Sequence, residues 1–122
     1  MKFAILALVI FLVAGTNACN VVSHSDCTDK PFNEVKSPDG KHVAIFFHRS
    51  CVNGALYTWV SLQEITRVFA ESEPILNVEG LHEISATWTD SNHLEISSEA
   101  LQHPESVRTK VTGWHNIAIA YK

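Results

Sequence analysis

The sequence lacks the motifs that usually mark an enzyme. It has no Gly-x-Ser-x-Gly nucleophile motif, no glycine loop for phosphate and no dinucleotide fingerprint. The dipeptide His82-Glu83 begins like the zinc-binding motif of metalloproteases, but Ala86 stands where that motif needs its second histidine. No Cys-x-x-Cys pair is present, and no histidine has the finger spacing to a cysteine pair. We therefore predict no catalytic residues, no metal site and no cofactor.

Positive charge is also scarce. The chain has 9 lysine and arginine residues against 13 aspartate and glutamate residues, with no basic run and no basic-aromatic stripe. A surface of this sign repels the phosphates of nucleic acids, so we predict that nucleic acid is not a partner. The 7 histidines are spread over the chain without tight spacing, which indicates strand-surface positions. Four glutamates favour a solvated acidic loop over a paired acid and base: Glu71, Glu73, Glu79 and Glu83.

Charge is absent altogether from one stretch near the N-terminus. After Lys2, residues 3–18 carry no charge, and residues 3–14 are apolar. This run is too short to cross a bilayer, which takes about 20 apolar residues. An apolar core followed by small and polar residues is typical of a secretory signal peptide, so we predict a leader over residues 1–18. Its removal takes Lys2 away and leaves 104 of the 122 residues, with 8 basic residues against 13 acidic ones, a formal net charge of −5.

The junction after the leader leaves two routes open. Ala18-Cys19 resembles the site where bacterial lipoproteins are cut and lipidated, although Thr16 and Asn17 stand where an aliphatic and a small or apolar residue are usual. Lipid on Cys19 would anchor the protein to a membrane, and we expect no other membrane contact. Ordinary signal-peptidase cleavage after Ala18 competes, with Thr16 and Ala18 as the small recognition residues. That route gives a freely secreted or periplasmic protein.

Cysteine is rare, and its number is odd: Cys19, Cys27 and Cys51. An oxidising compartment favours paired thiols, so one of the three needs another role. Lipid on Cys19 would supply that role and leave Cys27 and Cys51 as a disulfide. Such a bridge would close a loop of about 25 residues and contribute roughly 3 kcal/mol to stability. The alternative is that both are unpaired, buried thiols that act as small apolar residues.

The clearest structural signal is a turn followed by a strand. Pro38 presets φ for the first central residue of a turn, Asp39 hydrogen-bonds locally, and Gly40 permits positive φ. Residues 42–47 then alternate with apolar side chains on both faces, which indicates an interior strand. The turn motif comprises Ser37, Pro38, Asp39, Gly40 and Lys41.

A second alternating strand is predicted over residues 55–63, after a turn signal at residues 51–54. Tyr57 and Trp59 lie on one face of this strand, opposite Thr58 and Val60. We regard Tyr57 and Trp59 as a candidate binding surface. The alternative is that they pack as core residues or cross-strand pairs, as aromatic residues of small domains often do.

Short strands separated by turns are predicted for the rest of the chain. They cover residues 81–88, 93–98, 107–111 and 115–121, with a break at Pro74 and a loop over residues 101–106. Residues 75–80 are predicted to be a short strand or a loop. Residues 19–31 are polar and are predicted to be a tether or lead-in. We therefore predict one all-β domain over residues 32–122, an antiparallel sandwich or barrel of about seven to eight strands.

Two likenesses to known families support this interpretation. Residues 35–45 and 86–96 each contain a strand, an Asp-centred turn and a strand, and both resemble the hairpins of Tol-type β-propeller blades. A propeller needs about four blades, so this resemblance implies hairpins only. Ser37 to Lys41, the apolar strand and Cys51 are similar to the layout of a family of small exported bacterial proteins of unknown function. That resemblance implies export, often with a lipoprotein-type signal and an earlier cysteine at the place of Cys27.

These features favour a non-catalytic domain of the bacterial cell envelope, exported to the periplasm or the outer cell surface. It would bind a protein or a cell-wall component, and an inhibitor or immunity-like role belongs to this class. The sequence identifies neither the partner nor the oligomeric state. The alternative function is a small periplasmic hydrolase or metal-handling protein that uses the scattered histidines and carboxylates.

Overall fold

The computed structural model describes residues 26–65 and 72–122. The predicted leader at residues 1–18 and the predicted lipidation site at Cys19 lie outside these ranges. The described residues form nine strands and two short 3-10 helices. Their bounds are β1 (Cys27–Lys36), β2 (His42–Cys51), β3 (Leu56–Glu64), β4 (Ser72–Glu79), β5 (Ser85–Asp90), β6 (His93–Ser97), η1 (Glu99–Gln102), η2 (Pro104–Ser106), β7 (Val107–Lys110), β8 (Gly113–Trp114) and β9 (Ile117–Tyr121).

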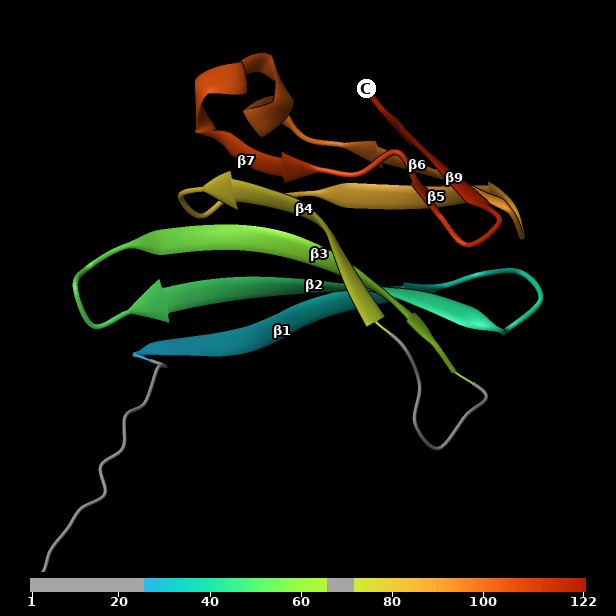
Figure 1. The fold of residues 1–122 in the computed structure, drawn as a ribbon, viewed down its shortest axis with the longest axis horizontal. Coiled ribbons are helices and arrows are strands. Elements are labelled where there is room, and N and C mark those ends of the chain that lie inside the picture. The colour runs from blue at the N-terminus through green and yellow to red at the C-terminus, as the bar shows by residue number, and fades with distance from the viewer. Residues whose placement is uncertain (1–25, 66–71) are drawn as a thin grey trace, which may run out of the picture.

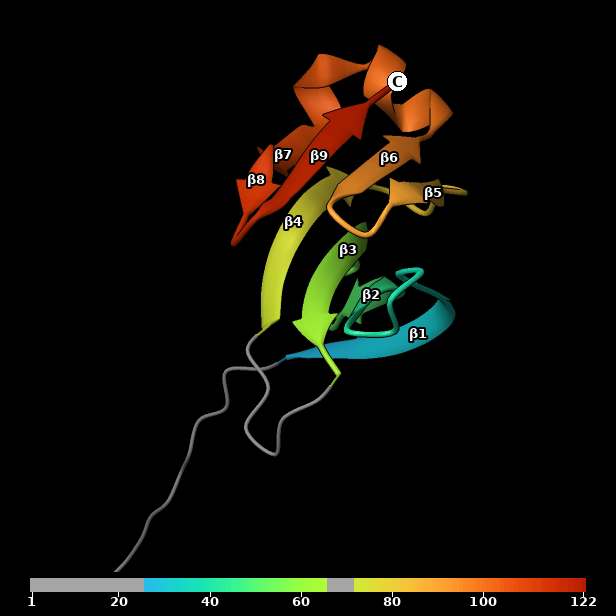
Figure 2. The same ribbon diagram turned by 90° about the vertical axis from the view of Figure 1, so that its right-hand side faces the viewer.

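The strands form two sheets that pack together, which confirms the predicted all-β class in its sandwich form. One sheet has five strands in the order β1-β2-β3-β4-β7, and the other has four in the order β5-β6-β9-β8. Figure 1 shows the long β1, β2 and β3 strands side by side. In Figure 2 the five-stranded sheet curves from β1 towards β7, with β5 and β6 on the inner side of the curve.

The strand number and one pairing differ from the prediction. The described part of the chain has nine strands because β8 is a separate strand of only two residues. All neighbouring strands are antiparallel except β6 and β9, which pair in parallel. Alternation along a sequence indicates that a strand exists, but it does not indicate which strand it pairs with or in which direction. The two hairpins expected from the propeller likeness do form, as β1–β2 and β5–β6.

The core lies between the two sheets and is built from alternate residues of their strands. In β2 and β3, Phe46 and Val60 point inward and are completely buried, together with Leu62. Ile96 of β6 and Ile117 of β9 meet them from the other sheet. Full burial of one such side chain contributes about 1.5–3 kcal/mol. This layer of apolar residues therefore sets which face of each strand is inside.

The predicted turn motif closes the β1–β2 hairpin. The Gly40 amide donates to the Ser37 carbonyl at 2.9 Å, and Gly40 adopts a φ of 71°. The Ser37 hydroxyl donates to the Asp39 carboxylate at 2.6 Å, and this hydrogen bond lowers the pKa of Asp39. The Lys41 amide also donates to the Asp39 carboxylate, at 3.0 Å. The Asp39 carboxylate thus satisfies donors that the tight turn would otherwise leave unpaired.

The predicted boundary between tether and domain was wrong. Structure was expected from Phe32, after a tether over residues 19–31, but β1 already begins at Cys27. Pro31 lies within this strand, where the pairing with β2 shifts register between Pro31 and Asn33. An edge strand tolerates proline because its outward amide has no ladder partner. The polar, almost fully exposed β1 gives no apolar alternation, so its strand character was not visible in the sequence.

Four local predictions in the later part of the chain were also wrong. The strand expected over residues 81–88 begins only at Ser85, and Pro74 lies inside β4 at a register shift instead of breaking it. The loop expected over residues 101–106 contains the end of η1 and all of η2. His115 is not part of the last strand, because its φ of 56° places it in the turn between β8 and β9. A register shift beside Pro74 and a turn at His115 thus account for two of these differences.

Tyr121 makes the fold less stable as the pH rises into the alkaline range. Its hydroxyl lies 2.7 Å from the Val111 carbonyl and 2.9 Å from the Ile75 carbonyl, and burial raises its pKa from 10.0 to about 12. Between these values the unfolded chain loses the phenolic proton while the folded chain keeps it, so stability falls as the pH rises. We expect the stability advantage of the wild type over Tyr121→Phe to shrink between pH 9 and pH 11 in urea unfolding. A constant difference would contradict this origin.

Candidate binding face

Tyr57 and Trp59 lie on the outer face of the five-stranded sheet, defined as the side turned away from the four-stranded sheet. Their neighbours Thr58 and Val60 are completely buried in the core, so alternation directs Tyr57 and Trp59 the opposite way. Both aromatic residues are half-buried. The structure therefore keeps the candidate binding surface outside the core, at the middle strand of its sheet.

The strand register arranges the outer face in two rows. One row crosses four strands at Asp29, Arg49, Tyr57 and Glu79. The next row crosses the same strands at Pro31, Phe47, Trp59 and Asn77. The first row thus places one aromatic ring among three charged groups, and the second row is mainly apolar and aromatic.

Trp59 is held by groups from the neighbouring strand. Its ring stacks on that of Phe47 with centroids 5.0 Å apart, and the Arg49 guanidinium lies 4.8 Å from its centroid. Arg49 in turn donates to both oxygens of Asp29, at 2.6 Å and 2.8 Å. This hydrogen bonding lowers the pKa of Asp29, so the carboxylate stays charged beside the arginine. Trp59 therefore also forms the cross-strand aromatic pair that the sequence left as an alternative.

Arg108 brings β7, the far edge of the sheet, to the same face. Its guanidinium lies 5.7 Å from the centroid of the Tyr57 ring and donates to Glu79 at 2.6 Å. About half of the Arg108 side chain is exposed, and Arg49 and Asp29 are about one third exposed. Exposed ion pairs of this kind add little to stability, typically below about 1 kcal/mol. Their side chains are therefore available to a partner at small cost to the fold.

A pocket of about 580 Å³ lies at the disulfide end of this face, and we call it the outer-face pocket. Its walls include Asp26, Arg49, Tyr57, Asn77 and Arg108. The bond between Cys27 and Cys51 borders the same pocket and joins two residues paired across β1 and β2. The predicted disulfide is thus present, and it joins β1, which follows Asp26, to β2, which carries Arg49.

Two polar atoms near the outer-face pocket have no hydrogen-bond partner in the described part of the chain. They are the indole nitrogen of Trp59 and the Oδ1 atom of Asn77, and both are buried. The two residues face each other across β3 and β4. A buried donor or acceptor without a partner costs about 1–3 kcal/mol, and native proteins keep few of them. Oδ1 of Asn77 is therefore a buried acceptor whose need the described chain does not meet, whereas the Trp59 indole lies close enough to Asp29 to help lower the pKa of that carboxyl.

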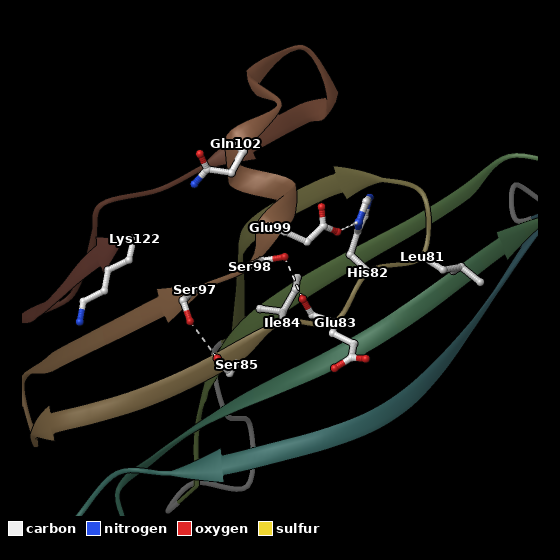
Figure 3. Close-up of a pocket in the computed structure, with 10 residues that line it drawn as sticks. All are labelled: Leu81, His82, Glu83, Ile84, Ser85, Ser97, Ser98, Glu99, Gln102 and Lys122. Atoms are coloured by element: carbon white, nitrogen blue, oxygen red, sulfur yellow. Dashed lines mark hydrogen bonds and ion pairs between the residues drawn. The ribbon is translucent and has the colours of Figure 1, made fainter.

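A larger pocket, of about 790 Å³, lies around His82 and η1 (Figure 3). The His82 ring lies between two acceptors, with Nδ1 2.7 Å from Glu99 and Nε2 2.7 Å from the Glu79 carbonyl. The hydroxyls of Ser85 and Ser97 lie 2.9 Å apart and bond to each other. These contacts engage both nitrogens of His82 in joining the β4–β5 connection to η1, which favours a structural role for this histidine.

Gly80 lies directly beneath His82 and provides a test of that role. A Cβ at Gly80 would lie 3.0 Å from Nε2 of His82, whereas a Cβ at Gly54, which has a similar positive φ, would meet nothing within 4 Å. We expect Gly54→Ala to cost about 1 kcal/mol through backbone strain alone, and Gly80→Ala to cost about 1 kcal/mol more. Chemical denaturation of the two variants measures the difference. Equal losses would show that the ring moves aside freely.

The histidines do not gather into a metal site within the described ranges. No group of three or more His, Cys, Asp or Glu side chains there has an arrangement that would hold a metal ion. His42 and His48, which share one face of β2, instead contact aromatic rings. His48 stacks on Phe32 with centroids 4.1 Å apart, and His42 meets the edge of Trp114 at 6.0 Å. Both side chains act in packing.

Comparison with protein-family models, with curated proteins and with solved structures found no match to this chain. Among the described residues, no helix is long and apolar enough to cross a membrane. The interpretation of the site therefore depends on its geometry.

Of the residues on the candidate binding face, Tyr57 and Trp59 were predicted and the two arginines were not. Tyr57 and Trp59 were predicted from alternation in one strand. Arg49 lies two residues after Phe47 in the same strand, so the sequence alone indicates that both side chains point to one face. Arg108 carries no such signal, because the sheet order β3-β4-β7 is what brings it over Tyr57.

Proposed function

We propose that this chain is an exported, non-catalytic domain of the bacterial envelope that binds a protein or cell-wall component through its outer face. The observation that carries this proposal is the joint placement of Tyr57, Trp59, Arg49 and Arg108 on one solvent-accessible sheet face. Tyrosine, tryptophan and arginine are the residues that most often dominate binding energy at interfaces. They combine large contact area with directional hydrogen bonds.

Export is supported by two independent features. The apolar leader at residues 1–18 has the layout of a secretory signal. The disulfide between Cys27 and Cys51 is of a kind that persists in oxidising compartments and is rare in the cytosol. Lipid on Cys19 would anchor the chain to a membrane shortly before β1 in the sequence. The similarity of the turn motif and Cys51 to small exported bacterial proteins agrees with this placement.

Binding to the envelope tests the proposal. We expect the purified mature protein to co-sediment with an envelope fraction of a bacterial host, and Tyr57→Ala to weaken that binding at least tenfold. Leu81→Ala is the matched control, since Leu81 is an apolar residue, 52% exposed, that lines the His82 pocket and not the outer face. Thermal unfolding establishes that both variants are folded. No sedimentation of the wild type, or equal loss in both variants, would refute the proposal.

A further inference from the structure

The outer-face pocket is nearly balanced in charge, although two arginines line it. Arg49 is paired with Asp29, and Arg108 is paired with Glu79. Asp26 adds a third carboxylate to the walls. An anionic ligand would have to compete with these carboxylates for the same guanidinium groups, so the local field gives it little advantage. The charges of this pocket therefore favour a neutral ligand.

The same pocket offers hydrogen-bonding groups of both kinds. Arg49 uses Nε and Nη2 on Asp29, which leaves the Nη1 donors, and Arg108 uses Nη1 on Glu79, which leaves Nε and Nη2. The Asp26 carboxylate supplies acceptors, and Asn77 also lines the pocket. A ligand that both donates and accepts at several closely spaced positions would satisfy all of these groups.

Sugar hydroxyls have this property, because each is at once a donor and an acceptor. The C–H groups of a sugar ring also pack well against an aromatic wall, which Tyr57 provides. The pocket volume of about 580 Å³ lies within the range of small-molecule sites. We propose that the outer-face pocket binds a neutral saccharide unit of an envelope glycan. This inference rests on the proposed function and names the chemistry of the partner at that face.

Titration with defined probes tests the inference by nuclear magnetic resonance of the mature, oxidised protein. The probes are a β-1,4-linked N-acetylglucosamine tetramer, maltotetraose and a tetraglutamate peptide. We expect at least one sugar to shift the side-chain amide of Asn77 and the guanidinium signals of Arg49 in a saturable manner. Arg108→Ala should weaken this binding at least tenfold, as expected for loss of a hydrogen bond to a charged group.

Lys110→Ala is the matched control, because it removes one positive charge from the same strand. Lys110 lies over Tyr121 and not over Tyr57, since the pairing of β4 with β7 shifts register between Asn77 and Val78. We expect sugar binding to be unchanged in this variant. If neither sugar binds, or if only tetraglutamate binds, the saccharide assignment is wrong. Binding of tetraglutamate alone would mean that the pocket binds carboxylates of a protein partner. If the wild type still co-sediments with envelopes, the proposed function stands without the saccharide. If it does not, both the proposed function and the saccharide assignment are wrong.

Discussion

Replacing both Cys27 and Cys51 by serine is expected to lower the free energy of unfolding by about 3 kcal/mol. The bond joins residues separated by 24 positions and closes the open end of the β1–β2 hairpin. Its removal enlarges the conformational freedom of the unfolded chain. Loss of the bond should also loosen β1 in the native state, because this strand is almost fully exposed and has few buried side chains to keep it on the sheet.

Urea unfolding of the oxidised wild type, the reduced wild type and the double variant measures this effect. We expect the reduced protein and the double variant to be similarly destabilised. Cys19→Ser is the control, since Cys19 is outside the disulfide, and it should unfold like the wild type. A loss below about 1 kcal/mol in the double variant would mean that pairing with β2 alone holds β1 in place.

Replacing Thr58 by valine is expected to cost about 2–3 kcal/mol, even though the two side chains have the same shape. Thr58 is completely buried, and its hydroxyl donates to the Gly80 carbonyl at 2.7 Å and accepts from the His82 amide at 2.9 Å. Valine would leave a backbone donor and a backbone acceptor without partners inside the protein. The connection between the two sheets would lose the contacts that hold it against β3.

Thr58→Ser is the matched control for this prediction. It keeps the hydroxyl and removes only one methyl group, which costs about 1 kcal/mol in a buried site. We expect serine to be better tolerated than valine when both are compared by chemical denaturation. If the valine variant is the more stable of the two, the hydroxyl contributes through packing alone and the assigned role of its two hydrogen bonds is wrong.

The parts of the fold that could be predicted are those where the inside and outside of a strand differ in polarity. Alternation correctly predicted the strands β2 and β3, and in β3 it correctly put Thr58 and Val60 on the face opposite Tyr57 and Trp59. The start of β1 could not be predicted, because an exposed edge strand needs no apolar face and Cys27 is held by a bond that the sequence only suggests. The parallel pairing of β6 with β9 depends on contacts distant in sequence, on which local alternation carries no information.

The candidate site shows the same division. Tyr57 and Trp59 were predicted because one strand determines which way both point. The sequence indicates which way Arg49 points, but its contact with Asp29 depends on the β1–β2 register. Arg108 contacts Tyr57 although it lies 51 positions further along the chain. Side chains brought together from separate strands by a sheet are visible only when the strand order is known.

Export is the claim on which the proposed binding role depends, and the intact mass of the protein isolated from its native host tests it directly. We expect a chain that begins at Cys19 and is two hydrogens lighter than its reduced form because Cys27 and Cys51 are joined. Added diacylglycerol and acyl mass would identify the lipid-anchored route, and its absence the freely secreted one. A full-length mass that includes residues 1–18, with all three thiols reduced, would contradict export and with it the proposed function.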